Sequence, residues 1–331
     1  MTAMASPHTE QGTPATPGAP AGVPASRGRR FSSRRAALRR RPWLLLAPML
    51  IVLAILLVWP LGRVIWLSFQ NYGLRELNRG TTNFVGFDNY AAIFGDEYLY
   101  SVVLPNTIGL AVACVVLTVG LGTLVALFLK GLPTFWRYVV STALMIAWAV
   151  PAVTGTYVWV FVFDPSNGLA TNLLGSLGVI EPGTVNWFLE RWSFYSIVTL
   201  NVVQHSIPFV AVTVLAGLLT VPDDLYEAAK IDGAGAWQRF WNVTAPNLRP
   251  VFAVVTILST IWDFKVFTQM WLMPGGGGTN PQVFNLSVWA YVQSFAQSEY
   301  GMGSAIAVVL TLVLMAITLV YLRTLFKEDE L

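Results

Sequence analysis

Cysteine and histidine are almost absent from this chain of 331 residues, which contains one cysteine and two histidines. Cys114 has no partner on the chain, so an intramolecular disulfide is impossible, and a small buried side chain is expected there. His205 has no companion ligands, so we expect no metal site. The glycines at 275–278 are not followed by Gly-Lys-Ser/Thr and form no nucleotide-binding loop. We therefore expect no cofactor, metal or ATP site on this chain.

Charged residues are also scarce. They make up 11% of the sequence, whereas 55% of the residues are hydrophobic, and the mean hydropathy is +0.60. Such a chain cannot cover itself with polar surface in water. A helix that crosses the bilayer core of about 30 Å needs about 20 mostly apolar residues. Six segments qualify, which are 43–69, 107–129, 138–163, 196–220, 250–273 and 302–322. The predicted fold class is an all-α integral membrane protein with about six transmembrane helices.

The basic residues indicate how the chain is threaded, because Lys and Arg accumulate in short cytoplasmic loops. With the N-terminus inside, fifteen of the 20 basic residues are cytoplasmic, and only Arg75, Arg79 and Arg191 lie on the opposite side. Both termini are therefore predicted to be cytoplasmic. The net charge of +3 comes mainly from the arginine run at 27–41, which predicts contact with membrane lipid and no nucleic-acid partner.

Residues 1–42 are rich in Pro and Ala and then basic, which predicts a disordered cytoplasmic tail. The Ser33-Arg34-Arg35 sequence before an apolar run could instead belong to a twin-arginine export signal. The first apolar run is long, lacks a small-x-small cleavage site and precedes five more runs, which favours an uncleaved anchor. Residues 324–331 are predicted to form a short cytoplasmic tail.

A polar segment separates the fourth and fifth apolar runs. Pro222, followed by two aspartates, predicts a helix start, because carboxylates are favoured at the positive end of the helix dipole. Helical spacing places Leu225, Ala228 and Ala229 on one face, a small apolar surface that suits a groove on another protein. Gly233 predicts an elbow that ends this helix.

A second helix is expected to run from the elbow through Trp237, Phe240 and Trp241 toward the fifth span. Two helices joined by a glycine elbow form a stiff connector that can transmit displacement to the spans. The alternative is an amphipathic connector that only lies on the membrane, with Trp237 and Trp241 at its interface.

The order of residues in this segment is Glu227-Ala228-Ala229, Asp232-Gly233-Ala234, and then Phe240, Val243 and Pro246. This pattern closely resembles the EAA loop of binding-protein-dependent ABC importer permeases, which docks onto ATPase subunits. The resemblance implies this coupling role for Glu227, Ala228, Ala229, Asp232, Gly233 and Ala234. Ala245 stands where leucine is usual in that family.

The resemblance covers most of residues 43–323 and narrows to the carbohydrate-type branch, which is maltose- and glycerol-3-phosphate-like. It rests on Trp59-Pro60-Leu61, Gly86-Phe87-Asp88-Asn89-Tyr90, Asn106-Thr107, Pro208-Phe209 and Trp262-Asp263-Phe264-Lys265-Val266-Phe267. Thr268 stands where Asp is common, and Pro274 where Thr is common.

The resemblance implies that residues 43–323 form the transmembrane domain of an ATP-driven importer in the cytoplasmic membrane. The chain would be a permease subunit for a sugar or sugar derivative, and not itself an enzyme. Its implied partners are a second permease, two ATPases and an external solute-binding protein. ATP and Mg²⁺ would be bound by the ATPases, and a heterodimer of permeases is the expected arrangement.

Candidates for the substrate path lie in the fifth span. Asp263 and Lys265 are costly near the middle of a span, by about 2.5–3.5 kcal/mol each, and should face protein or water. Neighbouring aromatic side chains could offer flat faces to a sugar. The candidate residues are Trp262, Asp263, Phe264, Lys265, Phe267 and Trp271, and Trp289 lies nearby in the sequence. A purely structural role for the two charged residues remains an equal alternative.

Pro151 and Pro208 fall inside predicted spans, where each removes a backbone hydrogen-bond donor. Kinked or interrupted spans are predicted at both points, with either a packing role or a gating role. Two rival functions also remain open at this point, an ion-coupled secondary transporter that uses Asp263 and a non-transporting membrane scaffold. Several buried acids or internal inverted repeats would favour the former, and the sequence shows neither.

Overall fold

Helices make up nearly all the regular structure in the computed structural model, which describes residues 45–181, 184–274, 277 and 279–328. Within these ranges the only β pairings are two isolated bridges, Gln70–Phe84 and Gly73–Glu299. The predicted all-α class is confirmed. The predicted tail at 1–42 lies outside the described residues.

Five described helices are long and apolar enough to cross a membrane. They are Leu45–Ser68, Leu99–Lys130, Arg191–Leu218, Arg249–Leu272 and Tyr300–Arg323. A sixth candidate span is the pair Thr134–Trp148 and Ala152–Val162, which is bent by 90°. These five helices and the bent pair correspond to the six predicted spans. The last helix, α16 (Tyr300–Glu328), continues into the predicted tail at 324–331.

The chain divides into two units, residues 1–60 and 61–331. The described residues of the first unit, 45–60, are helical throughout and include the π-helix η1 (Ala54–Val58) and the start of α2 (Trp59–Ser68). None of the residues in the apolar window of this first span is buried.

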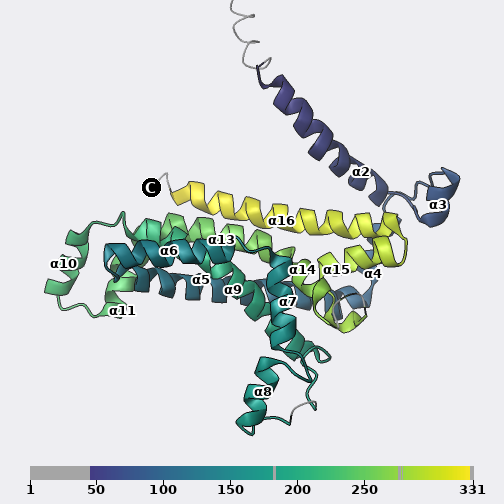
Figure 1. Ribbon diagram of the computed structural model, residues 1–331. Coiled ribbons are helices and arrows are strands. Elements are labelled where there is room, and N and C mark those ends of the chain that lie inside the picture. Colours follow the sequence, from purple (N-terminus) through teal and green to yellow (C-terminus); the bar gives the residue numbers. More distant parts are fainter. Residues whose placement is uncertain (1–44, 182–183, 275–276, 278, 329–331) are drawn as a thin grey trace, which may run out of the picture. The chain divides into compact units, whose positions relative to one another are not determined.

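The second unit is built around α9 (Arg191–Leu218), which lies beside α5 (Leu104–Lys130), α6 (Thr134–Trp148) and α13 (Arg249–Phe264) (Figure 1). More than half of the apolar window of α9 is buried, 56%, compared with 11% for α16. Gly122 lets α5 approach α9 closely, because a Cβ there would lie 2.7 Å from Cγ1 of Val210.

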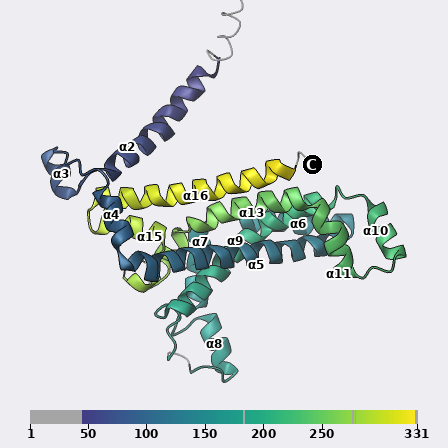
Figure 2. The same ribbon diagram turned by 180° about the vertical axis from the view of Figure 1, so that it is seen from behind.

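Short helices lie at the two ends of this bundle (Figures 1 and 2). At one end are α10 (Asp223–Ile231) and α11 (Ala236–Arg239), which lead through η3 (Phe240–Thr244) and α12 (Ala245–Asn247) into α13. At the other end are η2 (Leu99–Val103), α3 (Leu74–Arg79), α4 (Asp88–Gly95), α14 (Thr268–Leu272), η4 (Pro281–Val283), α15 (Leu286–Tyr291) and η5 (Val292–Ala296). The remaining helices, α7 (Ala152–Val162) and α8 (Leu169–Ser176), follow the bend after α6.

Polar side chains from α5 and α9 hold the loop that precedes α15. Asn106 donates through Nδ2 to the carbonyls of Gln282 (3.0 Å) and Phe284 (2.9 Å), and its Oδ1 accepts from Nε of Arg191 (2.8 Å). Asn285 donates to the carbonyl of Val266 at 2.7 Å. The loop is therefore tied both to the bundle and to the point where α13 ends.

Candidate functional site: an exposed loop helix and a cavity at the end of α13

Glu227, Ala228 and Ala229 of the EAA-like pattern lie in an exposed helix, α10, which has no buried residue and whose C-cap is Asp232. It begins directly after Pro222, with Asp223 and Asp224 in its first turn and Lys230 in its last, as the dipole argument predicts. Glu227 and Ala228 are exposed, and Ile231 is 87% exposed. An exposed helix with apolar residues on its surface can dock onto another protein.

Gly233 forms the predicted elbow with a φ of +79°, the left-handed region that glycine adopts at little cost. Its N–H donates to the carbonyl of Lys230 (3.0 Å), and the N–H of Ala234 donates to that of Ala229 (2.9 Å). A Cβ at Gly233 would meet nothing within 4 Å, so glycine is required here for its conformation alone.

Tyr226 connects α10 to the rest of the bundle. Its hydroxyl lies 3.1 Å from Oγ1 of Thr244 in η3, and Nζ of Lys130 lies 4.0 Å from the centre of its ring. Arg137 holds the turn after Lys130, because it donates to the carbonyls of residues 129, 130 and 132. The helix that carries Glu227 is thus attached to two segments that lead into membrane spans.

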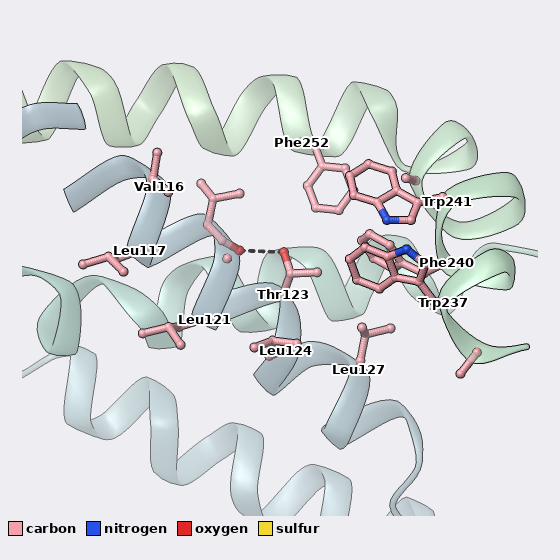
Figure 3. A pocket seen from close by; sticks show the side chains of 14 residues that line it. Val116, Leu117, Leu121, Thr123, Leu124, Leu127, Trp237, Phe240, Trp241 and Phe252 are labelled. Carbon is pink, nitrogen blue, oxygen red and sulfur yellow. Dashed lines mark hydrogen bonds between the residues drawn. The ribbon is translucent and has the colours of Figure 1, made fainter. Parts of the chain in front are cut away.

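The second half of the loop carries three aromatic rings in mutual contact. The ring centres of Phe240 and Trp241 are 5.1 Å apart, and those of Trp237 and Trp241 are 5.7 Å apart. A groove of about 710 Å³ lies between these rings, leucines of α5 such as Leu124, and Phe252 of α13 (Figure 3). The loop therefore borders both α5 and α13.

A cavity of about 350 Å³ lies where α13 ends, in the second unit. It is lined by Trp148, Val202, His205, Ser206, Trp262, Asp263, Lys265, Val266, Phe267, Thr268 and Gln269. Asp263 is 2% exposed, and among the described residues its Oδ2 has no hydrogen-bond partner. Lys265 is exposed and follows the last helical residue of α13.

Four of the six predicted path residues line this cavity, namely Trp262, Asp263, Lys265 and Phe267. Two do not, because Phe264 points into the protein with 9% exposure and Trp271 stacks on Phe267. Asp263 lies in the last turn of α13 and Lys265 directly follows that helix, past the middle of the span Arg249–Leu272, in which residues 265–267 are not helical. Trp289 is buried and packs against Tyr98. Within the described residues, no group of three or more His, Cys, Asp or Glu could hold a metal ion.

Comparison with known proteins decides the family. Residues 118–328 match the model of the binding-protein-dependent transport system inner membrane component. This chain belongs to that family. The diacetylchitobiose uptake system permease of Streptomyces coelicolor is 39% identical over 301 residues, which are 91% of this chain and 90% of the relative. The trehalose transport system permease of Mycobacterium tuberculosis H37Rv is 30% identical, over 83% of this chain and 85% of the relative.

A solved structure shows the same fold. The permease resembles a chain in the crystal structure of a bacterial ABC transporter that imports the acidic polysaccharide alginate, with a TM-score of 0.72. The two chains are 22% identical, and the match covers 88% of the permease and 98% of that chain. Family membership identifies a transport subunit and supports an importer over an ion-coupled transporter or a scaffold.

The two prolines of the permease behave differently. The span that contains Pro151 is interrupted, with α6 ending at Trp148 and α7 beginning at Ala152 after the 90° bend. Pro208 lies inside α9, which continues past it without an interruption, so of the two outcomes expected there only a kink stays a prediction. The bend at Pro151 places Trp148 against the cavity, where its ring stacks on that of Phe209 at 5.6 Å.

Sequence reasoning missed Tyr226, Thr244 and Lys130, whose contacts attach α10 to its neighbours. Tyr226 stands directly before Glu227, and this adjacency was the only local signal. The contact between positions 226 and 244 arises because the chain folds back at Gly233. His205, which we considered only as a metal ligand, lines the cavity instead.

Proposed function

We propose that the permease carries a sugar or sugar derivative across the cytoplasmic membrane, with a disaccharide of the diacetylchitobiose type as the first candidate. The energy comes from two separate ATPase subunits, which bind ATP and Mg²⁺. A second, different permease completes the path, and an external solute-binding protein delivers the cargo. The observation that carries this proposal is the exposed helix α10, which is attached through Tyr226 to the end of α5 and to η3, the segment that leads toward α13.

Coupling follows from this attachment. ATPase closure displaces α10, and Gly233 and the contact between Tyr226 and Thr244 pass the displacement to η3 and then to α13. The cavity lies at the far end of α13, so movement of this helix changes access to the cavity. The cavity thus alternates between two access states whose populations depend on the nucleotide.

The chemistry of the cavity suits a sugar. Trp148, Trp262 and Phe267 supply apolar ring surface, whereas Asp263, His205 and Gln269 supply groups that can bond hydroxyls. The Oδ2 of buried Asp263, which has no partner among the described residues, accepts a hydrogen bond from a sugar hydroxyl, which removes the cost of leaving a buried acceptor unsatisfied. Sugars in the names of two relatives, diacetylchitobiose and trehalose, support this cargo class.

The orientation places α10 and both termini in the cytoplasm. The distribution of basic residues supports it, since Lys230 and Arg239 lie in α10 and α11, and Lys130 and Arg137 flank the turn between α5 and α6. Those residues lie on the side where soluble ATPases can reach α10. The basic tail before residue 43 then contacts anionic lipid.

The decisive experiment is uptake of radiolabelled diacetylchitobiose by proteoliposomes that contain the assembled importer, with and without ATP. We expect uptake only with ATP, and Glu227→Lys should lower both uptake and recovery of the ATPase subunits by pull-down. Glu97→Lys, an equal charge reversal at an exposed site at the other end of the bundle, is the control. Uptake driven without ATP, or unchanged ATPase recovery with Glu227→Lys, would contradict the proposal.

A further inference from the structure

Six aromatic side chains form a continuous row at the end of the bundle opposite α10. This aromatic ladder consists of Tyr72, Tyr300, Phe295, Tyr291, Trp271 and Phe267. Successive ring centres are 6.3 Å (Tyr72–Tyr300), 6.4 Å (Tyr300–Phe295), 4.8 Å (Phe295–Tyr291) and 4.6 Å (Tyr291–Trp271) apart. The ring of Phe267 lies 5.0 Å from that of Tyr291 and 5.6 Å from that of Trp271.

The ladder leads to the cavity beside Asp263. Phe267 lines that cavity and also a second cavity of about 440 Å³, which Tyr291, Phe295 and Tyr300 line as well. The ladder is not part of the core, because Phe295 is 64% exposed and the other five rings are partly exposed. A series of accessible rings therefore connects the two cavities.

Hydroxyl groups accompany these rings. Ser287, Ser294 and Ser304 line the second cavity. The Oγ of Ser287 is buried and has no hydrogen-bond partner within the described part of the chain. Apolar ring faces combined with a few hydroxyl groups can bind a ligand that has both apolar faces and hydroxyls.

We propose that the aromatic ladder binds the trailing sugar units of an oligosaccharide whose leading units occupy the cavity beside Asp263. This inference rests on the proposed sugar cargo and extends it to chains longer than a disaccharide. The C–H faces of the pyranose rings lie on Tyr291 and Phe295, and a sugar hydroxyl satisfies Ser287. A lipid chain or an apolar face of another subunit would leave the Ser287 hydroxyl unpaired, which is unfavourable in a buried site.

The test compares two saccharides in the assembled importer, diacetylchitobiose and tetra-N-acetylchitotetraose, at saturating binding protein. Phe295→Ala should lower the maximal uptake rate of the tetrasaccharide by about tenfold, because stacking of one sugar unit is lost, while uptake of the disaccharide changes by less than about twofold. Phe128→Ala is the matched control, since Phe128 is 65% exposed and lies on α5 outside both cavities.

Equal losses for both saccharides, or no loss for the tetrasaccharide, would overturn the ladder as a chain-binding site. The ladder is also overturned as a chain-binding site if the unmodified importer carries only the disaccharide. If neither saccharide is taken up with ATP, the proposed cargo is contradicted instead.

A second measurement probes occupancy without transport. The single native cysteine, Cys114, is buried, so a thiol introduced by Ser294→Cys can be labelled selectively on this chain with a maleimide. We expect tetra-N-acetylchitotetraose to slow the labelling and diacetylchitobiose to have a smaller effect. Labelling that neither saccharide slows would show that lipid or protein covers the site and would overturn the inference.

Discussion

The hydroxyl of Tyr226 lies 3.1 Å from Oγ1 of Thr244, across the fold made by the glycine elbow. Removing it with Tyr226→Phe keeps the ring beneath Lys130 but removes a hydrogen bond that contributes about 1 kcal/mol. We expect the number of sugars carried per ATP hydrolysed to fall by about fivefold, with ATPase recovery unchanged. Parallel assays of uptake and ATP hydrolysis measure this ratio.

Tyr138→Phe provides the control for that comparison, because Tyr138 is 70% exposed. A ratio that is the same in both variants and in the unmodified importer would rule out the hydroxyl as part of the coupling route.

Gly233→Ala should weaken binding of the ATPase. An L residue in the left-handed region costs about 1 to 2 kcal/mol, so the elbow opens and α10 is displaced. Gly235→Ala is the matched control, because Gly235 has a φ of −66° and a Cβ there would meet only Oε1 of Gln238, at 3.9 Å. Affinity for the ATPase is measured by titration in detergent. The requirement for an elbow is refuted if both substitutions reduce affinity equally.

Asp263→Asn should reduce transport without disturbing assembly. The substitution replaces an acceptor oxygen by an N–H donor in a buried site beside the cavity, and a buried polar group left without its partner costs about 1 to 3 kcal/mol. We therefore expect maximal sugar uptake to fall by about tenfold or more, while the ATPases are recovered as before. Asp88→Asn, at an exposed position at the start of α4, is expected to have little effect. Normal uptake by Asp263→Asn would remove this residue from the path.

Gly122→Ala should destabilise the bundle, because the new methyl group would lie 2.7 Å from Cγ1 of Val210. Overpacking of this kind typically costs about 1 to 3 kcal/mol. Gly120 lies two residues earlier on the same helix, and a Cβ there would meet nothing within 4 Å. Thermal inactivation in detergent should therefore occur at a lower temperature for Gly122→Ala than for Gly120→Ala. Identical midpoints would mean that α5 and α9 can separate at this point without cost.

The local sequence was sufficient to predict the spans and the elbow at Gly233. Each span could be recognised as an apolar run long enough to cross the bilayer core. The cost of burying polar groups in lipid applies to every segment independently of the others. Gly233 could be identified as a turn because only glycine adopts its backbone conformation cheaply. The exposed surface of α10 was likewise expected from the small side chains at 228 and 229.

The effect of the prolines could not be settled by sequence alone. Both Pro151 and Pro208 lack a backbone N–H donor, yet only the span with Pro151 is interrupted. Pro208 is buried in α9, which packs against several neighbours. Packing of this kind can keep a helix continuous despite a missing hydrogen bond, and it depends on residues far away in the sequence.

Hydropathy, charge and one family pattern in the sequence by themselves determined a membrane-spanning permease with an EAA-like loop between its fourth and fifth spans. Only the tertiary structure decided that Tyr226 meets Thr244, that α13 ends at the cavity, and that Tyr72 and Tyr300 continue the aromatic row toward Phe267. The physical reason is the distance along the chain over which each interaction acts. The cost of entering lipid and the conformation of glycine depend on residues within one segment. Contacts between side chains from different segments depend instead on how all the helices pack together.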